Sequence, residues 1–386
     1  MSKPNRHQKP PGAFRWFDLH HWVGLKLSIL MSFILITGTF AVVSHEIDWL
    51  AKPALRVLPV HAAPDQDWQG LWDSARAARP DWNFSWISAP IDPWFAAEAV
   101  GVTPSGALRR LYIHPGTLAV QGEGSWINAQ RVLRDSHRRL MIPHRLGIIV
   151  VSLLAIPLLL SLISGLFVYK KFWRGFFRKP RNRDSRTLWG DLHRLGGVWS
   201  LWLILVIGLT SLWYLVEAVG QMTGMTVAPY PQRDISASAI AMPDTQAPDL
   251  NDMARHIRAQ APDFEIEVVY PPKFADDPIR FSGSNQAILT RPRANVFSFD
   301  GQTGQALSRI EGTDLSAIQR LSELADPLHF GNFAGWISKL VYFVFGVILS
   351  GLSLSGIYVF SARIRRRGIA APSHRTAPTR LAGAAQ

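Results

Sequence analysis

The 386-residue chain carries 41 Lys and Arg against 28 Asp and Glu, is 48% hydrophobic and has no cysteine. The absence of cysteine excludes disulfides, iron–sulfur clusters and a C-x-x-C-H site for covalent haem in this chain. The net charge of +13 argues only weakly for a nucleic-acid partner, because the excess lies in short stretches beside apolar segments. That placement is typical of a membrane protein with a positive cytoplasmic side, and we expect no nucleic-acid partner.

Four apolar segments predict four membrane-spanning helices, at residues 23–43, 147–169, 196–216 and 336–362. The second, the third and the fourth from residue 340 onward contain no charged residue, and about 20 apolar residues are enough to cross a bilayer core. Lys26 lies near the start of the first segment, where its long side chain can reach the interface. No short basic region and no A-x-A cleavage pattern mark this segment as a removed signal peptide, so we expect an uncleaved anchor.

The charge distribution predicts the orientation of these helices. Stretches 1–22, 170–195 and 363–386 hold 19 basic and 3 acidic residues, whereas stretches 44–146 and 217–339 hold 21 basic and 25 acidic residues. The positive-inside rule therefore places both termini and the basic loop 170–195 in the cytoplasm. The chain is predicted to be a four-pass protein of a bacterial inner membrane, with residues 44–146 and 217–335 in the periplasm and residues 1–22 and 363–386 as cytoplasmic tails.

The two periplasmic segments have the patterns of folded domains and resemble each other. Residues 68–90 and 249–271 each show an amphipathic helix pattern, then a Pro-Asp pair, then alternating strand residues. Strand-like runs around a Gly-containing turn follow at 108–124 and 295–312. The predicted fold is therefore an all-α four-helix transmembrane bundle that carries two periplasmic α+β domains, each with a small antiparallel sheet.

The apolar segments also repeat, because each contains a short motif of small residues near its later part. The motifs are Ile36-Thr37-Gly38, Ile163-Ser164-Gly165, Leu209-Thr210-Ser211 and Leu354-Ser355-Gly356. A histidine precedes each motif, 17 residues before Thr37 and Thr210 and 27 or 26 residues before Ser164 and Ser355. This pattern predicts a duplicated unit of two helices, in which small residues allow close helix packing or leave room for a flat ligand.

The four histidines form the candidate site. Topology places His20 and His193 at the cytoplasmic ends of the first and third helices, and His137 and His329 at the outer ends of the second and fourth. Histidine is common at membrane interfaces, but the symmetric pairing favours iron ligands, so we predict two b-type haems, each bound by two histidines. His144 is an alternative to His137, since it lies seven residues further on the same helical face, and His45 is a weaker alternative.

The sequences around these histidines, LHHWVGL at 19–25, SHRRL at 136–140, LHRLG at 192–196 and LHFG at 328–331, resemble the PepSY-associated transmembrane helix family over nearly the whole chain. Within that family the chain is most similar to inner-membrane ferric-siderophore reductases. The resemblance implies PepSY-type periplasmic domains, two b haems held by His20, His193, His137 and His329, and reduction of iron on the periplasmic side. His21, where the family often has Arg, and His144 depart from the family pattern.

The function we expect is transmembrane electron transfer from a cytoplasmic or quinol donor to a periplasmic ferric siderophore, which releases ferrous iron. The chain has neither a Gly-x-Gly-x-x-Gly motif after a strand nor a P-loop, so a separate reductant is expected. One alternative is a membrane-anchored regulator of a peptidase, which leaves the histidines unexplained. Another is a transporter of haem or a metal chelate, although no predicted helix interior carries the charged pair typical of a coupled transporter.

Overall fold

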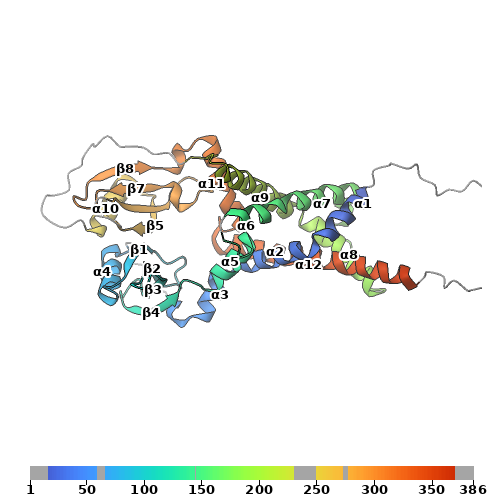
Figure 1. Cartoon of the computed structure of the whole chain (residues 1–386), viewed down its shortest axis with the longest axis horizontal. Helices are drawn as coiled ribbons and strands as arrows, with labels where there is room; N and C mark the ends of the chain where they lie inside the picture. Colours follow the sequence, from blue (N-terminus) through green and yellow to red (C-terminus); the bar gives the residue numbers. More distant parts are fainter. Residues whose placement is uncertain (1–15, 59–65, 144, 230–248, 273–276, 370–386) are drawn as a thin grey trace, which may run out of the picture.

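The computed structural model describes residues 16–58, 66–143, 145–229, 249–272 and 277–369. A β-sheet with its own helices lies at one end of an elongated bundle of longer helices, and both ends of the described chain lie at the far end of that bundle (Figure 1). The bundle is formed by α1 (Trp16–Lys26), α2 (Ser28–Val42), α3 (Ser44–Ala51), α5 (Ala129–Arg139), α6 (Arg145–Leu153), α7 (Ala155–Val168), α8 (Ser185–Trp199), α9 (Leu201–Met222), α11 (Ala317–Phe330) and α12 (Gly335–Ile369).

Among the described residues, three stretches of helix are long and apolar enough to cross a membrane: Arg145–Val168, Leu201–Met222 and Gly335–Ala362. Helices α2 and α3 would make a fourth if the pair, bent by 63°, is a single span. The chain is thus a membrane protein with three such spans, or four with the bent pair. The short break between α6 and α7 lies at Leu154, where Pro157 has no N–H to donate to the carbonyl of Leu153.

Helices α2 and α12 pack closely along a seam of small polar residues. The hydroxyls of Ser32 and Ser353 lie 2.8 Å apart and those of Thr39 and Ser350 lie 3.2 Å apart. Gly346 faces Thr39 so closely that an added Cβ would lie 2.7 Å from its hydroxyl oxygen. Small residues of this kind let membrane helices approach and hydrogen-bond one another.

The sheet domain contains a single sheet of eight antiparallel strands in the order β4-β3-β2-β1-β5-β6-β7-β8. Its strands are β1 (Asn83–Ser88), β2 (Ala97–Val102), β3 (Leu108–Ile113), β4 (Val120–Ser125), β5 (Glu265–Tyr270), β6 (Ile279–Ser284), β7 (Val296–Phe299) and β8 (Ala306–Ile310). We expected a small sheet in each of two separate domains, and this is wrong: each half is a four-stranded meander, and β1 pairs with β5 to join the halves. The joining satisfies backbone groups that two open edges would leave exposed.

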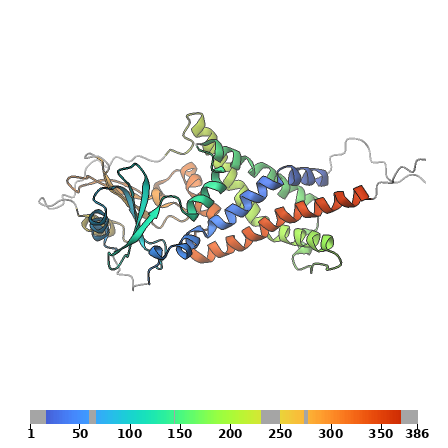
Figure 2. The same ribbon diagram turned by 60° about the horizontal axis from the view of Figure 1, so that its bottom comes forward.

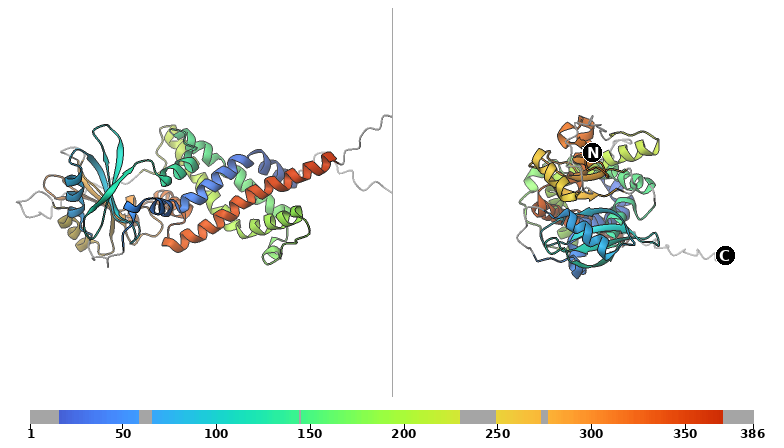
Figure 3. Two further views of the ribbon diagram at one scale, coloured as in Figure 1. Left: turned by 90° about the horizontal axis from the view of Figure 1, so that it is seen from below. Right: turned by 90° about the vertical axis from the view of Figure 1, so that its left-hand side faces the viewer.

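Helices α4 (Trp68–Ala78) and α10 (Leu250–Gln260) pack side by side on one face of this sheet, the face turned away from the bundle (Figure 3). Leu71 from α4 and Met253 and Ile257 from α10 are fully buried in the same core as Phe281 and Phe299 of the sheet. Each helix thus covers its own half, and the two halves share one hydrophobic core.

Two short helices within the segments that we assigned to the periplasm lie beside the membrane helices. Helix α5 packs against α2, and α11 packs against α9, as the turned view shows (Figure 2). Left-handed residues end both helices: Leu140 and Met141, with φ of 55° and 57°, follow α5, and Gly331, with φ of 68°, follows α11. His137 and His329 therefore lie on short helices of their own, separate from the spanning helices on which we had placed them.

Candidate functional site: two pairs of histidines

The first pair is His137 of α5 and His329 of α11, at the end of the bundle nearer the sheet (Figure 1). Their ring centres lie 6.0 Å apart, with an angle of 45° between the planes. Two imidazoles that bind one metal ion from opposite sides at about 2.0–2.1 Å have ring centres roughly 6 Å apart. The spacing of this pair therefore suits two ligands of one metal ion held between the rings.

Local structure holds the two helices that carry this pair. Backbone N–H groups of Ala129 and Gln130, in the first turn of α5, both donate to the buried carboxylate of Asp48 on α3, at 3.0 Å. Helix α11 begins with a capping box, in which Ser316 and Gln319 satisfy each other's backbone N–H groups. Both histidine-bearing helices are thus anchored at the ends remote from the histidines.

The hydrogen bonds of His137 and His329 define which ring nitrogen carries the proton. His137 Nδ1 lies 2.9 Å from the carbonyl oxygen of Ile34, which only accepts, so Nδ1 is the protonated nitrogen. His329 Nδ1 lies 2.8 Å from the hydroxyl oxygen of Thr210. That hydroxyl already donates to the carbonyl of Val206, so it accepts from His329. In the neutral form, Nε2 of each ring therefore keeps its lone pair for a metal.

The second pair, His20 of α1 and His193 of α8, lies at the end of the bundle away from the sheet (Figure 1). The two side chains are close enough to interact electrostatically. His20 Nδ1 contacts the Ser164 hydroxyl at 3.0 Å, and His193 Nδ1 contacts the Ser355 hydroxyl at 3.0 Å. Both hydroxyls donate to carbonyls of their own helix, so the rings again donate through Nδ1 and leave Nε2 free.

These contacts give the small-residue motifs a role. Within each two-helix unit, the motif of one span receives the histidine that precedes the other span. Thus Gly38 lies under the ring of His137, where an added Cβ would be 2.6 Å from Cε1. A Cβ added at Gly165 would lie 3.6 Å from Cε1 of His20, and one added at Gly356 would lie 3.4 Å from Cε1 of His193. We had noted the motifs but assigned them only to helix packing or to space for a ligand.

The arrangement is chemically suited to a group that needs two axial ligands. Among the described residues, no cluster of three or more His, Asp or Glu side chains could hold a metal ion, as a zinc or non-haem iron site of protein ligands requires. Haem iron accepts two imidazoles as protein ligands, because the macrocycle supplies the others. The donor set of each histidine pair is therefore compatible with a b-type haem.

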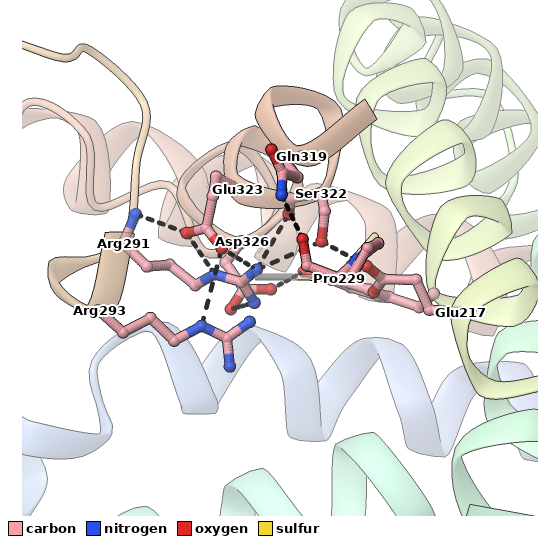
Figure 4. A network of polar contacts seen from close by, with 9 residues as sticks. Glu217, Pro229, Arg291, Arg293, Gln319, Ser322, Glu323 and Asp326 are labelled. Carbon is pink, nitrogen blue, oxygen red and sulfur yellow. Dashed lines mark hydrogen bonds and ion pairs between the residues drawn. The ribbon is translucent and has the colours of Figure 1, made fainter. Parts of the chain in front are cut away.

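A polar network links the β6–β7 connection of the sheet domain to helix α11, which carries His329 (Figure 4). Arg291, in the β6–β7 connection, donates to Glu323 at 2.6 and 2.8 Å and to Asp326 at 3.0 Å. Asp326 in turn accepts from the Tyr214 hydroxyl at 2.6 Å, and the Tyr214 ring lies 5.2 Å from that of His329. This network could not be predicted from the sequence, because its members lie on three separate segments.

The other candidate histidines have different surroundings. His144 lies outside the described residues. His45 lies on α3, and the charged groups acting on it are Lys339, Glu46, Asp48 and Arg110. His21 packs its ring against Phe360 at 4.4 Å, on a different side of α1 from His20. His137 is thus the described histidine of this region that lies against His329.

Comparison with known proteins agrees with the membrane architecture. The PepSY-associated TM region family matches residues 17–363, and the chain belongs to this family. A relative is the uncharacterized protein PA4219 of Pseudomonas aeruginosa, 24% identical over 235 residues that cover 56% of this chain and 59% of the relative. The match thus spans somewhat more than half of that relative's length.

Proposed function

We propose that the protein is a two-haem membrane oxidoreductase that reduces a ferric siderophore on the periplasmic side and so releases ferrous iron. The observation that carries the proposal is the pair of neighbouring histidines at each end of the bundle, all four with Nδ1 occupied by a hydrogen bond and Nε2 left for a ligand. In this proposal both termini are cytoplasmic, the chain crosses the inner membrane four times, and the sheet domain is periplasmic.

When bound, a b-type haem supplies reversible one-electron transfer between ferric and ferrous iron. His20 and His193 would hold the haem near the cytoplasmic side, and His137 and His329 the haem near the sheet domain. The hydroxyls of Ser164, Ser355 and Thr210 and the carbonyl of Ile34 accept from Nδ1 and so orient the rings, as the hydrogen-bond partners of metal-binding histidines do. The reductant is a quinol or a cytoplasmic donor, and the acceptor is the ferric ion of the chelate, which gains one electron.

The test is the visible spectrum of the full chain purified in detergent, oxidised and then reduced with dithionite, together with a pyridine haemochrome assay. We expect about two b haems per chain, with low-spin spectra typical of two histidine ligands. His137→Ala and His20→Ala should each remove the signal of one haem. His21→Ala is the matched control, since its ring packs on Phe360, and it should keep both. A chain that stays colourless after haem is added would contradict the proposal and favour a regulatory role.

A further inference from the structure

A basic cavity of about 570 Å³ opens between α5, α6 and the end of α9. Five arginines and only one carboxylate line it, together with three apolar side chains. The lining residues are Arg131, Arg134, Asp135, Arg138, Arg139, Arg145, Leu146, Ile148 and Met222.

Among the described residues, Arg139 is the one arginine of these five that has an anionic partner. Asp135 is paired with Arg139 at 2.7 Å, and Arg145 donates to the carbonyl of Gln221 at 2.8 Å. In the part of the chain that the structure describes, the side chains of Arg134 and Arg138 form no ion pair or hydrogen bond with another residue. Nε of Arg131 is likewise buried without an acceptor, and its guanidinium lies over Trp126. The cavity therefore presents donors that an anion would satisfy.

The cavity is not the space between the histidines. On a helix with about 100° per residue, positions 131, 134, 135 and 138 share one face of α5, and His137 lies about 110° away from the centre of that face. Neither His137 nor His329 lines the cavity.

The position of the cavity along the bundle indicates what fills it. Arg145 is the first residue of one candidate span and Met222 is the last residue of another, so the arginines lie where a bilayer's polar headgroups begin. Leu146 and Met222 are 55% and 61% exposed and extend the cavity wall toward the apolar part of the spans. A ligand that fits both regions has an anionic group joined to hydrocarbon.

We propose that this cavity binds an anionic phospholipid, with its phosphate between Arg134, Arg138 and Arg131 and its chains along Leu146 and Met222. Arg guanidinium groups bind phosphate oxygens in a planar, bidentate geometry, and basic pockets between membrane helices are a recurring form of lipid headgroup site. The excess positive charge selects a headgroup with net negative charge over a zwitterionic one. The proposal does not depend on the redox function.

The experiment measures the thermal stability of the full chain in detergent as phosphatidylglycerol, phosphatidylcholine or inorganic phosphate is added. We expect phosphatidylglycerol to stabilise the protein well below the concentration at which phosphatidylcholine does, and inorganic phosphate to have little effect. The double variant Arg134→Gln/Arg138→Gln should need about tenfold more phosphatidylglycerol for the same stabilisation, because it loses charge-assisted hydrogen bonds. Arg134→Lys/Arg138→Lys, which keeps the charge, should retain much of the response.

Arg255→Gln is the matched control, because it removes one exposed arginine from α10 of the sheet domain and should respond like the unchanged protein. Equal responses of the double variant and the unchanged protein would overturn the proposal. So would equal stabilisation by phosphatidylcholine. Stabilisation by inorganic phosphate alone would show that the ligand is a soluble anion and not a lipid. Loss of visible absorbance in the double variant, with an unchanged lipid response, would assign the arginines to the histidine site.

Discussion

The hydroxyl of Thr210 is the only protein group that the described structure offers as acceptor for Nδ1–H of His329, and Thr210→Val removes it. The change replaces the hydroxyl with a methyl group of similar size and leaves a buried imidazole N–H unsatisfied. An unsatisfied buried donor costs about 1–3 kcal/mol of unfolding free energy. If His329 binds a haem, loss of the hydroxyl that orients its ring should also weaken haem binding by about 10–100-fold.

Thr37→Val is the matched control, because Thr37 occupies the corresponding place in the first span. Its hydroxyl donates to the carbonyls of Phe33 and Ile34 at 2.8 and 3.2 Å. His137 donates through Nδ1 to the backbone carbonyl of Ile34 and not to this hydroxyl. Thr37→Val therefore leaves the histidine bond intact and should cost less than about 1 kcal/mol, the usual net value of one hydrogen bond.

The assay is chemical or thermal unfolding in one detergent, combined with titration of haem followed by visible absorbance. Thr210→Ser should behave nearly like the unchanged protein, because it keeps the hydroxyl. Equal losses of stability in Thr210→Val and Thr37→Val would refute the reasoning, since only one of the two hydroxyls accepts from a histidine.

Three further perturbations test other parts of the structure. Gly38→Ala should destabilise the protein by about 1–3 kcal/mol through overpacking against the histidine ring, whereas Gly24→Ala, with nothing within 4 Å of the new Cβ, should be neutral or stabilising in a melting experiment. Arg291→Gln should lower the free energy of unfolding by about 3–5 kcal/mol, because it removes the main partner of the buried Glu323 carboxylate. Arg293→Gln is the control: its side chain is 55% exposed and 3.7 Å from that carboxylate, so the loss should be under about 1 kcal/mol. Equal losses in the two variants would contradict the role of the network. Burial raises the pKa of Glu267 above its usual 4.5, so the folded state binds this proton more tightly than the unfolded state does. The stability that Glu267 contributes should therefore fall as the pH rises from 4.5 through the raised pKa. In a pH series of melting curves, Glu267→Gln should remove that fall.

The parts of the fold that follow from local pattern were predictable. Apolar runs identify membrane helices because the bilayer demands about 20 apolar residues. The membrane class, the presence of an α+β domain and the family are confirmed. The strand patterns predicted at the ends of stretches 68–90 and 249–271 also correspond to real strands, β1 and β5. Their joining was not predictable, because nothing in an alternating strand pattern says which other edge it will pair with.

The positions of His137 and His329 depended on tertiary packing. Residues 129–139 are AQRVLRDSHRR, a strongly polar run that resembles a surface helix of the outer domain. Only its packing against α2 brings His137 onto Gly38, and the left-handed residues Leu140 and Met141 then turn the chain into α6. The spacing from histidine to motif was visible in the sequence, but the partner of each motif was not, since the contact is with a different helix.

The reciprocal contacts explain why the histidines and the small-residue motifs occur as a duplicated set. In the first unit, α1 supplies His20 to Ser164, and α2 supplies the backbone of Ile34 to His137. In the second, α8 supplies His193 to Ser355, and α9 supplies Thr210 to His329. Each apolar segment with its preceding histidine therefore contributes a ring at one end of the bundle and an acceptor at the other. Losing one such segment would disturb both ends at once, so the two histidine pairs are expected to be retained or lost together in chains built from these units.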